Sequence, residues 1–301
     1  MARRRSGRNI SGFLLLDKPA GPTSNQALQR VRRLLDASKA GHTGTLDPMA
    51  TGMLPVCCGA ATKVAGLAIQ AGKHYETTGR LGAATETGDS SGSVVGVAEI
   101  PELDADAFGA VLQRFSGVIE QVPPRYSAIR HEGRRLYELA RKGIQVEASA
   151  RKVTIHSIEL IDVAWPEFTL RVHCSKGTYI RTLVEDIGRE LGSLAHVTAL
   201  RRTGVDPFVD QQMVSFEDLE AVATPEERAE RFLLPVDLVL MHWPQIEISH
   251  GQAQRIRLGQ RIALDAPPET GSYRIYEPSS SFIGIGEITS EGELRPKRIF
   301  L

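Results

Sequence analysis

The chain has 301 residues, of which 42% are hydrophobic and 24% charged, as expected of a folded protein with one large domain or a large and a small one. No apolar run reaches the roughly 18 residues of a membrane span, and no apolar stretch follows the basic N-terminus MARRRSGRNISG. We therefore expect neither a membrane span nor a secretory signal, and predict a cytoplasmic protein. Cys57, Cys58 and Cys174 lack zinc-binding spacing, so we expect reduced and mostly buried thiols.

The net charge of zero hides an uneven distribution. Residues 1–80 carry 12 Lys and Arg against 4 Asp and Glu, and residues 123–202 carry 14 against 9. Between them, residues 81–122 carry 1 against 7, and residues 203–247 carry 2 against 10. Two basic blocks that fold together would form a surface for nucleic-acid phosphates. Charge alone favours the alternative that these side chains merely solvate helices.

The N-terminal third begins with a strand in GFLLLDKPAG, which runs into a Pro/Gly turn. A helix follows in PTSNQALQRVRRLLDA, where Thr23 or Ser24 caps the N-terminus and the apolar residues recur at helical spacing. AGHTGTLDPMATG has the composition of a loop, and GMLPVCCG that of a strand.

The central part mixes strands and helices without regular alternation. We predict strands in KHYETTGRLG, GSVVGVAEI, RKVTIHSIELIDVAW and EFTLRVHCSKG, and helices in DADAFGAVLQRF and TYIRTLVEDIGRELG. The arginine-rich segment 124–143 is expected to be helical in its second half. This order favours an α+β domain with a mixed, mostly antiparallel sheet and flanking helices.

Residues 205–245 turn acidic and helical, which suggests a boundary there. Beyond them, the short apolar segments QIEIS, QRIAL, GSYRIYE, FIGIGEI and KRIF are separated by Gly, Pro and Ser, as in a small β-rich module. We predict a catalytic domain in residues 1–245 and a small β-rich domain in residues 246–301.

Common catalytic signatures are missing, including the GxxxxGK[ST] phosphate loop, GxGxxG, GxSxG and HExxH. Four segments remain as candidates for chemistry. They contain Asp47 in a Gly/Thr-rich loop, Tyr75 at a strand start, Tyr179 and Arg181 where a helix begins, and Lys18 before a proline. Each has an ordinary explanation: Asp47 as a turn residue, Tyr75 as packing, Arg181 as a surface partner of Glu185, and Lys18 as a strand-ending turn.

Taken together, these segments resemble one family across nearly the whole chain. LLLDKPAGPTSNQAL, AGHTGTLDPMATGMLPVCCGAATK, KHYETTGRLGAATETGDSSG, QVPPRYSAIRHEGRRLYELARKG, CSKGTYIRTLVEDIGRELG and AHVTALRRT follow in the order and rough spacing of the bacterial tRNA pseudouridine-55 synthases. The resemblance implies the pseudouridine synthase fold, a C-terminal RNA-binding module of PUA type, and isomerisation of a uridine to pseudouridine at position 55 in the T-arm loop of tRNA.

The resemblance also implies the chemistry. The reaction breaks the N1–C1′ bond, rotates the uracil and rejoins it through C5, so neither a metal nor a cofactor is expected. Asp47 matches the family's nucleophile, and three routes stay open: addition to C6, addition to C1′, or deprotonation of the sugar to a glycal. Because the carboxylate must be ionised, we expect a cation that lowers its pKa, and Arg181 matches that partner.

Other positions match residues around the substrate. The target base must be flipped out of its loop, and stacking side chains offset the cost of a few kcal/mol. Tyr75 matches the aromatic that lies against the uracil, Tyr179 and Leu200 match pocket residues, and His42 matches a residue that contacts the RNA. Lys18 and Pro19 match a motif that supports the pocket from behind.

The segment of about 124–150 matches a family insertion that clamps the RNA stem-loop. Its basic residues would contact phosphates, and the family more usually has Lys where this chain has Arg130, which preserves charge but changes geometry. The predicted backbone contacts are Arg130, Arg134, Arg135, Arg141 and Lys142. The chain lacks the lysine-rich extension of relatives that work with guide RNA, so we expect a stand-alone enzyme, as a monomer.

Two other function classes remain as alternatives. A non-catalytic RNA-binding or RNA-folding protein on the same scaffold would make Asp47 dispensable. A hydrolase or transferase of free uridine nucleotides is disfavoured by the two basic blocks and the terminal module.

Overall fold

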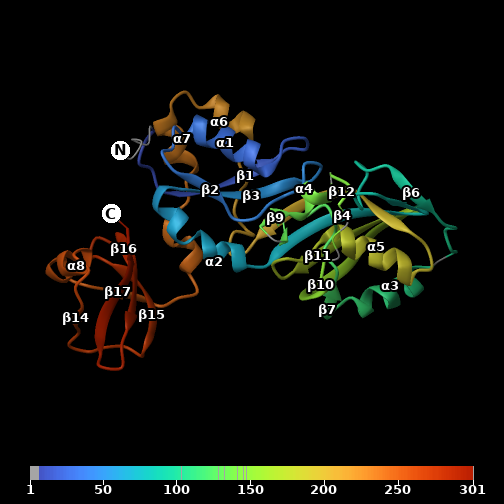
Figure 1. The fold of residues 1–301 in the computed structure, drawn as a ribbon. Coiled ribbons are helices and arrows are strands. Elements are labelled where there is room, and N and C mark those ends of the chain that lie inside the picture. The colour runs from blue at the N-terminus through green and yellow to red at the C-terminus, as the bar shows by residue number, and fades with distance from the viewer. Residues whose placement is uncertain are drawn as a thin grey trace.

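The computed structural model describes residues 7–300 except 103, 128, 132, 141, 145 and 147. Within these residues, no helix combines the length and the apolar character needed to cross a membrane. The architecture is α+β, as predicted: an eight-stranded sheet with flanking helices is followed by a separate five-stranded sheet near the C-terminus (Figure 1).

The large sheet has the strand order β1-β3-β12-β4-β11-β10-β7, and β2 pairs with β3. Its neighbours are antiparallel except for a short parallel contact between β12 and β3. The strands are β1 (Gly12–Lys18), β2 (Ala40–His42), β3 (Thr51–Cys58), β4 (Lys73–Leu81), β7 (Gly117–Gln121), β10 (Arg151–Ala164), β11 (Glu167–Cys174) and β12 (Ala195–Val205). Two small hairpins lie outside it: β5 (Ala83–Thr85) with β6 (Val94–Val97), and β8 (Arg130–His131) with β9 (Arg134–Arg135).

The apolar run of β1 is explained by burial on both faces. Leu14 and Leu16 join one core cluster, whereas Phe13 and Leu15 join a second cluster on the other side of the strand. Strand β4, in contrast, alternates between buried and more exposed residues, so only one of its faces is covered. The sheet is therefore closed on both sides near β1 and open on one side near β4.

Several helices pack against the first of these clusters, whereas η1 (Gly59–Lys63), α2 (Ala65–Gln70) and η2 (Val236–Leu240) pack against the second. α1 (Ser24–Leu34) is capped by Thr23, one of the two N-cap residues predicted from the sequence, and Thr23 also forms a capping box with Gln26. α3 (Ala105–Arg114) and α5 (Ile180–Glu190) pack at the opposite end of the sheet from α1 (Figure 1). The remaining helical elements are α4 (Leu136–Ala140), α6 (Phe216–Ala221) and α7 (Pro225–Phe232).

The C-terminal module has the strand order β13-β15-β16-β17-β14. It consists of β13 (Gln245–Glu247), α8 (His250–Arg257), β14 (Ile262–Ala263), β15 (Gly271–Tyr276), β16 (Phe282–Ile288) and β17 (Glu293–Ile299). The sequence predicted the strands but not α8, whose buried apolar side chains are only Ala253 and Ile256. The module has its own core, yet Phe282, Ile285 and Phe300 pack into the second cluster of the large domain.

Candidate active site

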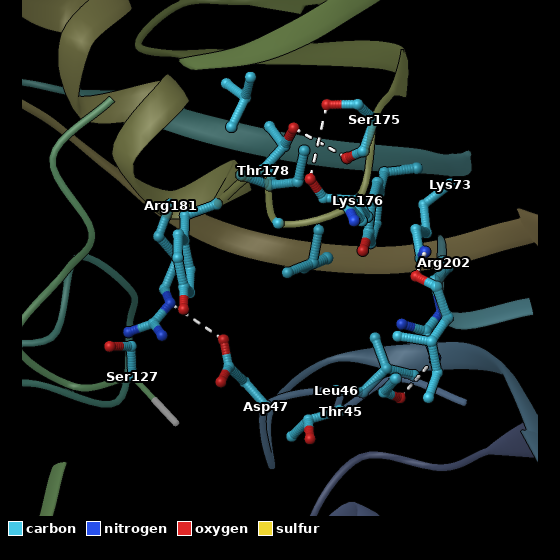
Figure 2. A pocket seen from close by; sticks show the side chains of 18 of the residues that line it. Thr45, Leu46, Asp47, Lys73, Ser127, Ser175, Lys176, Thr178, Arg181 and Arg202 are labelled. Carbon is cyan, nitrogen blue, oxygen red and sulfur yellow. Dashed lines mark hydrogen bonds and ion pairs between the residues drawn. The ribbon is translucent and has the colours of Figure 1, made fainter. Parts of the chain in front are cut away.

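A cavity of about 520 Å³ opens where the loop before β3, strands β4 and β12, and the start of α5 meet. Figure 2 shows Asp47 reaching into it from the loop, with Arg181 facing the carboxylate and Arg202 and Lys73 on the other side. Among the predicted site residues, Asp47, Tyr75, Tyr179, Arg181 and Leu200 line this cavity. Segments more than 150 residues apart in the chain are thus joined at one place, as the resemblance implied.

The loop that carries Asp47 is held from behind by polar contacts. Ser24 at the start of α1 exchanges two hydrogen bonds with the backbone of Leu46, at 2.8 and 2.9 Å. Lys18 is fully buried, and its Nζ donates to the carbonyls of Pro19, Pro22 and Pro48. Lys18 and Pro19 therefore lie behind the loop rather than in the cavity lining.

Asp47 and Arg181 form the ion pair of the site. Arg181 Nε lies 3.0 Å from Asp47 Oδ2, with 4% of the Arg181 side chain and 35% of the Asp47 side chain exposed. The buried guanidinium also donates to the carbonyls of Thr87 and Tyr126 and lies 3.6 Å from Asp89 Oδ2. Arg181 is therefore not a solvated surface partner of Glu185, which instead pairs with Arg189.

The pKa of Asp47 departs from the expectation in direction. Burial raises the pKa of this carboxyl above its ordinary value, and Asp89 adds to that effect, while Arg181 opposes it. The expected cation is present, but it only partly offsets desolvation. Asp47 thus becomes protonated at a higher pH than an exposed aspartate does.

Tyr75 and Arg202 form a buried pair that the sequence did not reveal. They occupy neighbouring positions on β4 and β12, and the guanidinium of Arg202 hydrogen-bonds the Tyr75 hydroxyl. Arg202 Nε also donates to Met53 at 2.7 Å, and Nη2 to Gly44 at 3.1 Å. Burial raises the pKa of Tyr75, so the phenol stays protonated at neutral pH. Residues two apart on a strand share a face, so the predicted pocket residue Leu200 could have pointed to Arg202 as a neighbour in the site.

Tyr179 stands at the N-cap of α5 and is fixed through its backbone. Its N–H donates to Gln121 Oε1 at 2.9 Å, and its carbonyl accepts from Gln121 Nε2 at 3.0 Å. The Arg151 guanidinium lies 4.8 Å from the centroid of the Tyr179 ring. Gln121 of β7 and Arg151 of β10 therefore hold the Tyr179 ring in place at the cavity.

Charge around the cavity is strongly unbalanced. Among the described lining residues, six are Lys or Arg and one, Asp47, is a carboxylate; the cations are Lys73, Arg151, Lys152, Lys176, Arg181 and Arg202. Burial lowers the pKa of Lys73 to about 8. Such a lining favours a polyanion and disfavours a metal cation as the partner of Asp47.

Three other predicted contacts whose side chains the structure describes, His42, Arg134 and Lys142, are not part of the cavity lining. His42 is half-buried on β2, where its Nδ1 accepts the N–H of Gly44 at 3.4 Å, and it is not part of the cavity lining. Arg130, Arg134 and Arg135 belong to the β8–β9 hairpin; Arg134 and Lys142 are exposed. Arg141 lies outside the described residues, as do the side chains of Arg130 and Arg135. The three cysteines are free and buried, as predicted.

Comparison with known proteins identifies the chain from end to end. Residues 32–180 match the TruB family pseudouridylate synthase N-terminal domain, residues 181–241 the tRNA pseudouridylate synthase B C-terminal domain, and residues 244–300 the C-terminal domain of pseudouridine synthase II TruB. The tRNA pseudouridine synthase B of Nitrosococcus oceani is 49% identical over 99% of this chain and 97% of its own length. The protein of the same name from Pseudomonas aeruginosa is 48% identical over 98% of both chains.

Solved structures agree with this result. A chain of a Cbf5-Nop10-Gar1 complex superimposes with a TM-score of 0.69 and 25% identity, over 96% of this chain and 85% of its own length. A chain of an H/ACA RNP bound to a substrate RNA, 24% identical with a TM-score of 0.70, shares the fold over 100% of this chain and 92% of that chain. The chain therefore belongs to the TruB family of pseudouridylate synthases.

Proposed function

We propose that this enzyme converts uridine 55 in the T-arm loop of tRNA to pseudouridine, with Asp47 as the nucleophile. The observation that carries the proposal is the Asp47–Arg181 pair, a carboxylate held by a buried guanidinium inside a cavity lined with cations. The carboxylate supplies the reactive group, and the surrounding cations suit the phosphates on either side of the target nucleotide.

The isomerisation needs no further reactant. The N1–C1′ bond breaks, the uracil turns, C5 bonds to C1′, and the proton on C5 is exchanged for one on N1. A carboxylate at the position of Asp47 serves any of the three routes, by attack on C6, by attack on C1′, or as the base that produces a glycal. In each route Arg181 stabilises the ionised form against the desolvation that opposes it.

The flipped uracil is proposed to rest between the apolar and aromatic side chains of the cavity. Tyr75 and Leu200 come from adjacent strands, β4 and β12, and Tyr179 comes from the start of α5. Stacking on an aromatic ring stabilises an unstacked base by about 1–3 kcal/mol, which is comparable to the cost of removing it from its loop. His42 is proposed to contact the RNA beside the cavity.

The RNA outside the cavity is proposed to meet two further surfaces. The insertion of about 124–150 would clamp the stem-loop through phosphate contacts from Arg130, Arg134, Arg135, Arg141 and Lys142. The chain would divide into a catalytic domain, residues 1–245, and a PUA-like RNA-binding module, residues 246–301. We propose a monomer that works in the cytoplasm without a guide RNA.

The decisive experiment compares the wild-type chain with Asp47→Asn on a T-arm stem-loop containing labelled uridine. The variant should bind the RNA with little change in affinity but form no pseudouridine, because an amide is not a competent nucleophile. Full turnover by Asp47→Asn would refute the nucleophile and favour a non-catalytic role for this residue. Free UMP is the control: rapid turnover of UMP by the wild-type chain would point to a nucleotide-modifying enzyme instead.

A further inference from the structure

A cluster of two imidazoles and one carboxylate lies on the sheet face opposite the cavity. His74 sits between Lys73 and Tyr75 on β4, and since those two residues line the cavity, His74 points to the other side of the strand. His173 is directly opposite His74 on β11, and Asp206 follows the last residue of β12. Three strands that are distant in sequence thus contribute one side chain each.

The potential ligand atoms of the cluster are close together. His74 Nε2 lies 3.1 Å from Asp206 Oδ1, and His173 Nε2 lies 3.5 Å from Asp206 Oδ2. All the ligand atoms lie within 4.8 Å of one another. Because metal–ligand bonds to imidazole nitrogen and carboxylate oxygen are about 2.0–2.2 Å, two ligands of one tetrahedral ion lie roughly 3–3.5 Å apart. Small side-chain rotations would bring the set to that geometry.

The arrangement of the two imidazoles suits metal ligation. Their rings stack with centroids 4.0 Å apart and planes 9° from parallel, an arrangement that two positive charges would oppose. His173 Nε2 is buried and makes no hydrogen bond of normal geometry among the described residues; Asp206 Oδ2 lies 3.5 Å from it. A bound cation would satisfy this atom.

Gly72 keeps the space beside these atoms clear. Its backbone does not adopt a positive φ, so conformational freedom is not the reason for a glycine here. A Cβ at this position would collide with Asp206 Oδ2 and would lie 2.7 Å from His173 Nε2. The glycine therefore leaves room where the potential ligand atoms converge.

We propose that His74, His173 and Asp206 bind a divalent transition-metal ion, with Zn²⁺ as the best match. Two imidazoles and one carboxylate are ligands that Zn²⁺ prefers over the harder Mg²⁺ and Ca²⁺, and water completes the coordination. The ion links β4, β11 and the end of β12 on the reverse side of the strand that presents Tyr75. It acts as a structural clamp, and no step of the isomerisation passes through it.

The test is a titration of the full-length, chelator-treated and desalted protein with ZnCl₂ by isothermal calorimetry. One saturable site per chain is expected, and an ion at about 100 times its Kd should raise the Tm by about 4 °C. A Co²⁺ titration should give the weak visible bands of nitrogen and oxygen ligands without a thiolate charge-transfer band. Absence of saturable binding, or a thiolate band from the cysteines, would overturn the proposal.

Variants locate the site. His74→Ala and Asp206→Asn should each abolish the saturable binding, and Gly72→Ala should weaken it while leaving all three ligands in place. His156→Ala is the matched control, because its ring lies 4.6 Å from that of His173 but outside the ligand set, and it should bind as the wild type does. Equal Tm values in chelator show that a variant is folded. Unchanged binding by both His74→Ala and Asp206→Asn would exclude this site.

Discussion

Replacing Arg181 with glutamine should move the acidic limb of the pH–activity profile upward. Two unit charges about 4 Å apart interact by about 4 kcal/mol at an effective dielectric constant of ~20. Since 35% of the Asp47 side chain is exposed, solvent screening reduces this to about 2 kcal/mol. That energy displaces the acidic limb of the profile by about 1.5 pH units. Burial already raises the pKa of Asp47 and Arg181 opposes the rise, so loss of the guanidinium raises the pKa further.

The same substitution has a second effect, on stability. Asp89 is buried beside Arg181, with its Oδ2 3.6 Å from Nη1, and it would lose this cation. An uncompensated buried carboxylate costs about 3 kcal/mol. Adding Asp89→Asn to Arg181→Gln should restore most of the lost free energy of unfolding, because the buried group is then neutral. It also removes a negative charge that raises the pKa of Asp47, so the acidic limb of the double variant should lie between those of Arg181→Gln and the wild type.

The assay is the single-turnover rate on a T-arm stem-loop, measured from about pH 4.5 to pH 8. Arg181→Lys is the control, since it retains the charge while losing the planar guanidinium, and its acidic limb should stay near that of the wild type. If Arg181→Gln slowed the reaction equally at every pH, with no displacement of the limb, Arg181 would act by positioning alone and the electrostatic reasoning would be wrong.

Three further predictions concern the site. At neutral pH, the Tm of Asp47→Asn should equal or exceed that of the wild type. Because the pKa of Asp47 is higher in the folded state than in the unfolded state, ionisation of this carboxyl destabilises the fold, and the cost develops as pH rises from the unfolded-state pKa to the folded-state pKa. A clear drop in Tm would contradict this. Lys18→Met should lower the free energy of unfolding in urea by about 3 kcal/mol and reduce kcat, because the carbonyls of Pro19 and Pro22 in the turn after β1 and of Pro48 in the Asp47 loop lose their shared donor; a variant with unchanged stability and unchanged kcat would show that Lys18 does not support the loop. Tyr75→Phe should keep RNA affinity while Tyr75→Leu weakens it about tenfold, measured by filter binding; equal affinities would rule out stacking. RNA affinity should also fall steeply with added salt, and a flat response would contradict the phosphate-facing surface.

Local patterns were enough to predict much of the fold. The capped helix after Thr23, the paired long strands β10 and β11, and the loop containing Asp47 all follow from spacing and composition over short stretches. The joint pattern of motifs then placed Tyr75, Tyr179, Arg181 and Leu200 around one cavity, and all four line it.

What escaped prediction depends on contacts between distant segments. The position of β12 between β3 and β4 is a matter of strand pairing, which side-chain alternation does not determine. Arg202 shares a strand face with Leu200, but the carbonyls that satisfy its buried guanidinium, those of Met53 and Gly44, lie about 150 residues earlier and are brought to it only by the fold. The direction of the Asp47 pKa shift is likewise set by desolvation, which only the folded environment reveals.

Phe282, Ile285 and Phe300 pack into the same core cluster as Phe13 and Leu15 of β1, which has a consequence for how the protein folds during translation. The first strand to be synthesised has one face that is completed only by the last residues of the chain. At a translation rate of about 5–20 residues per second, roughly 15–60 s pass between the synthesis of β1 and that of the C-terminal residues that pack against this face. The nascent large domain therefore has an uncovered apolar patch until the last strands are made, and a chain that terminates early would leave the ribosome with this patch exposed.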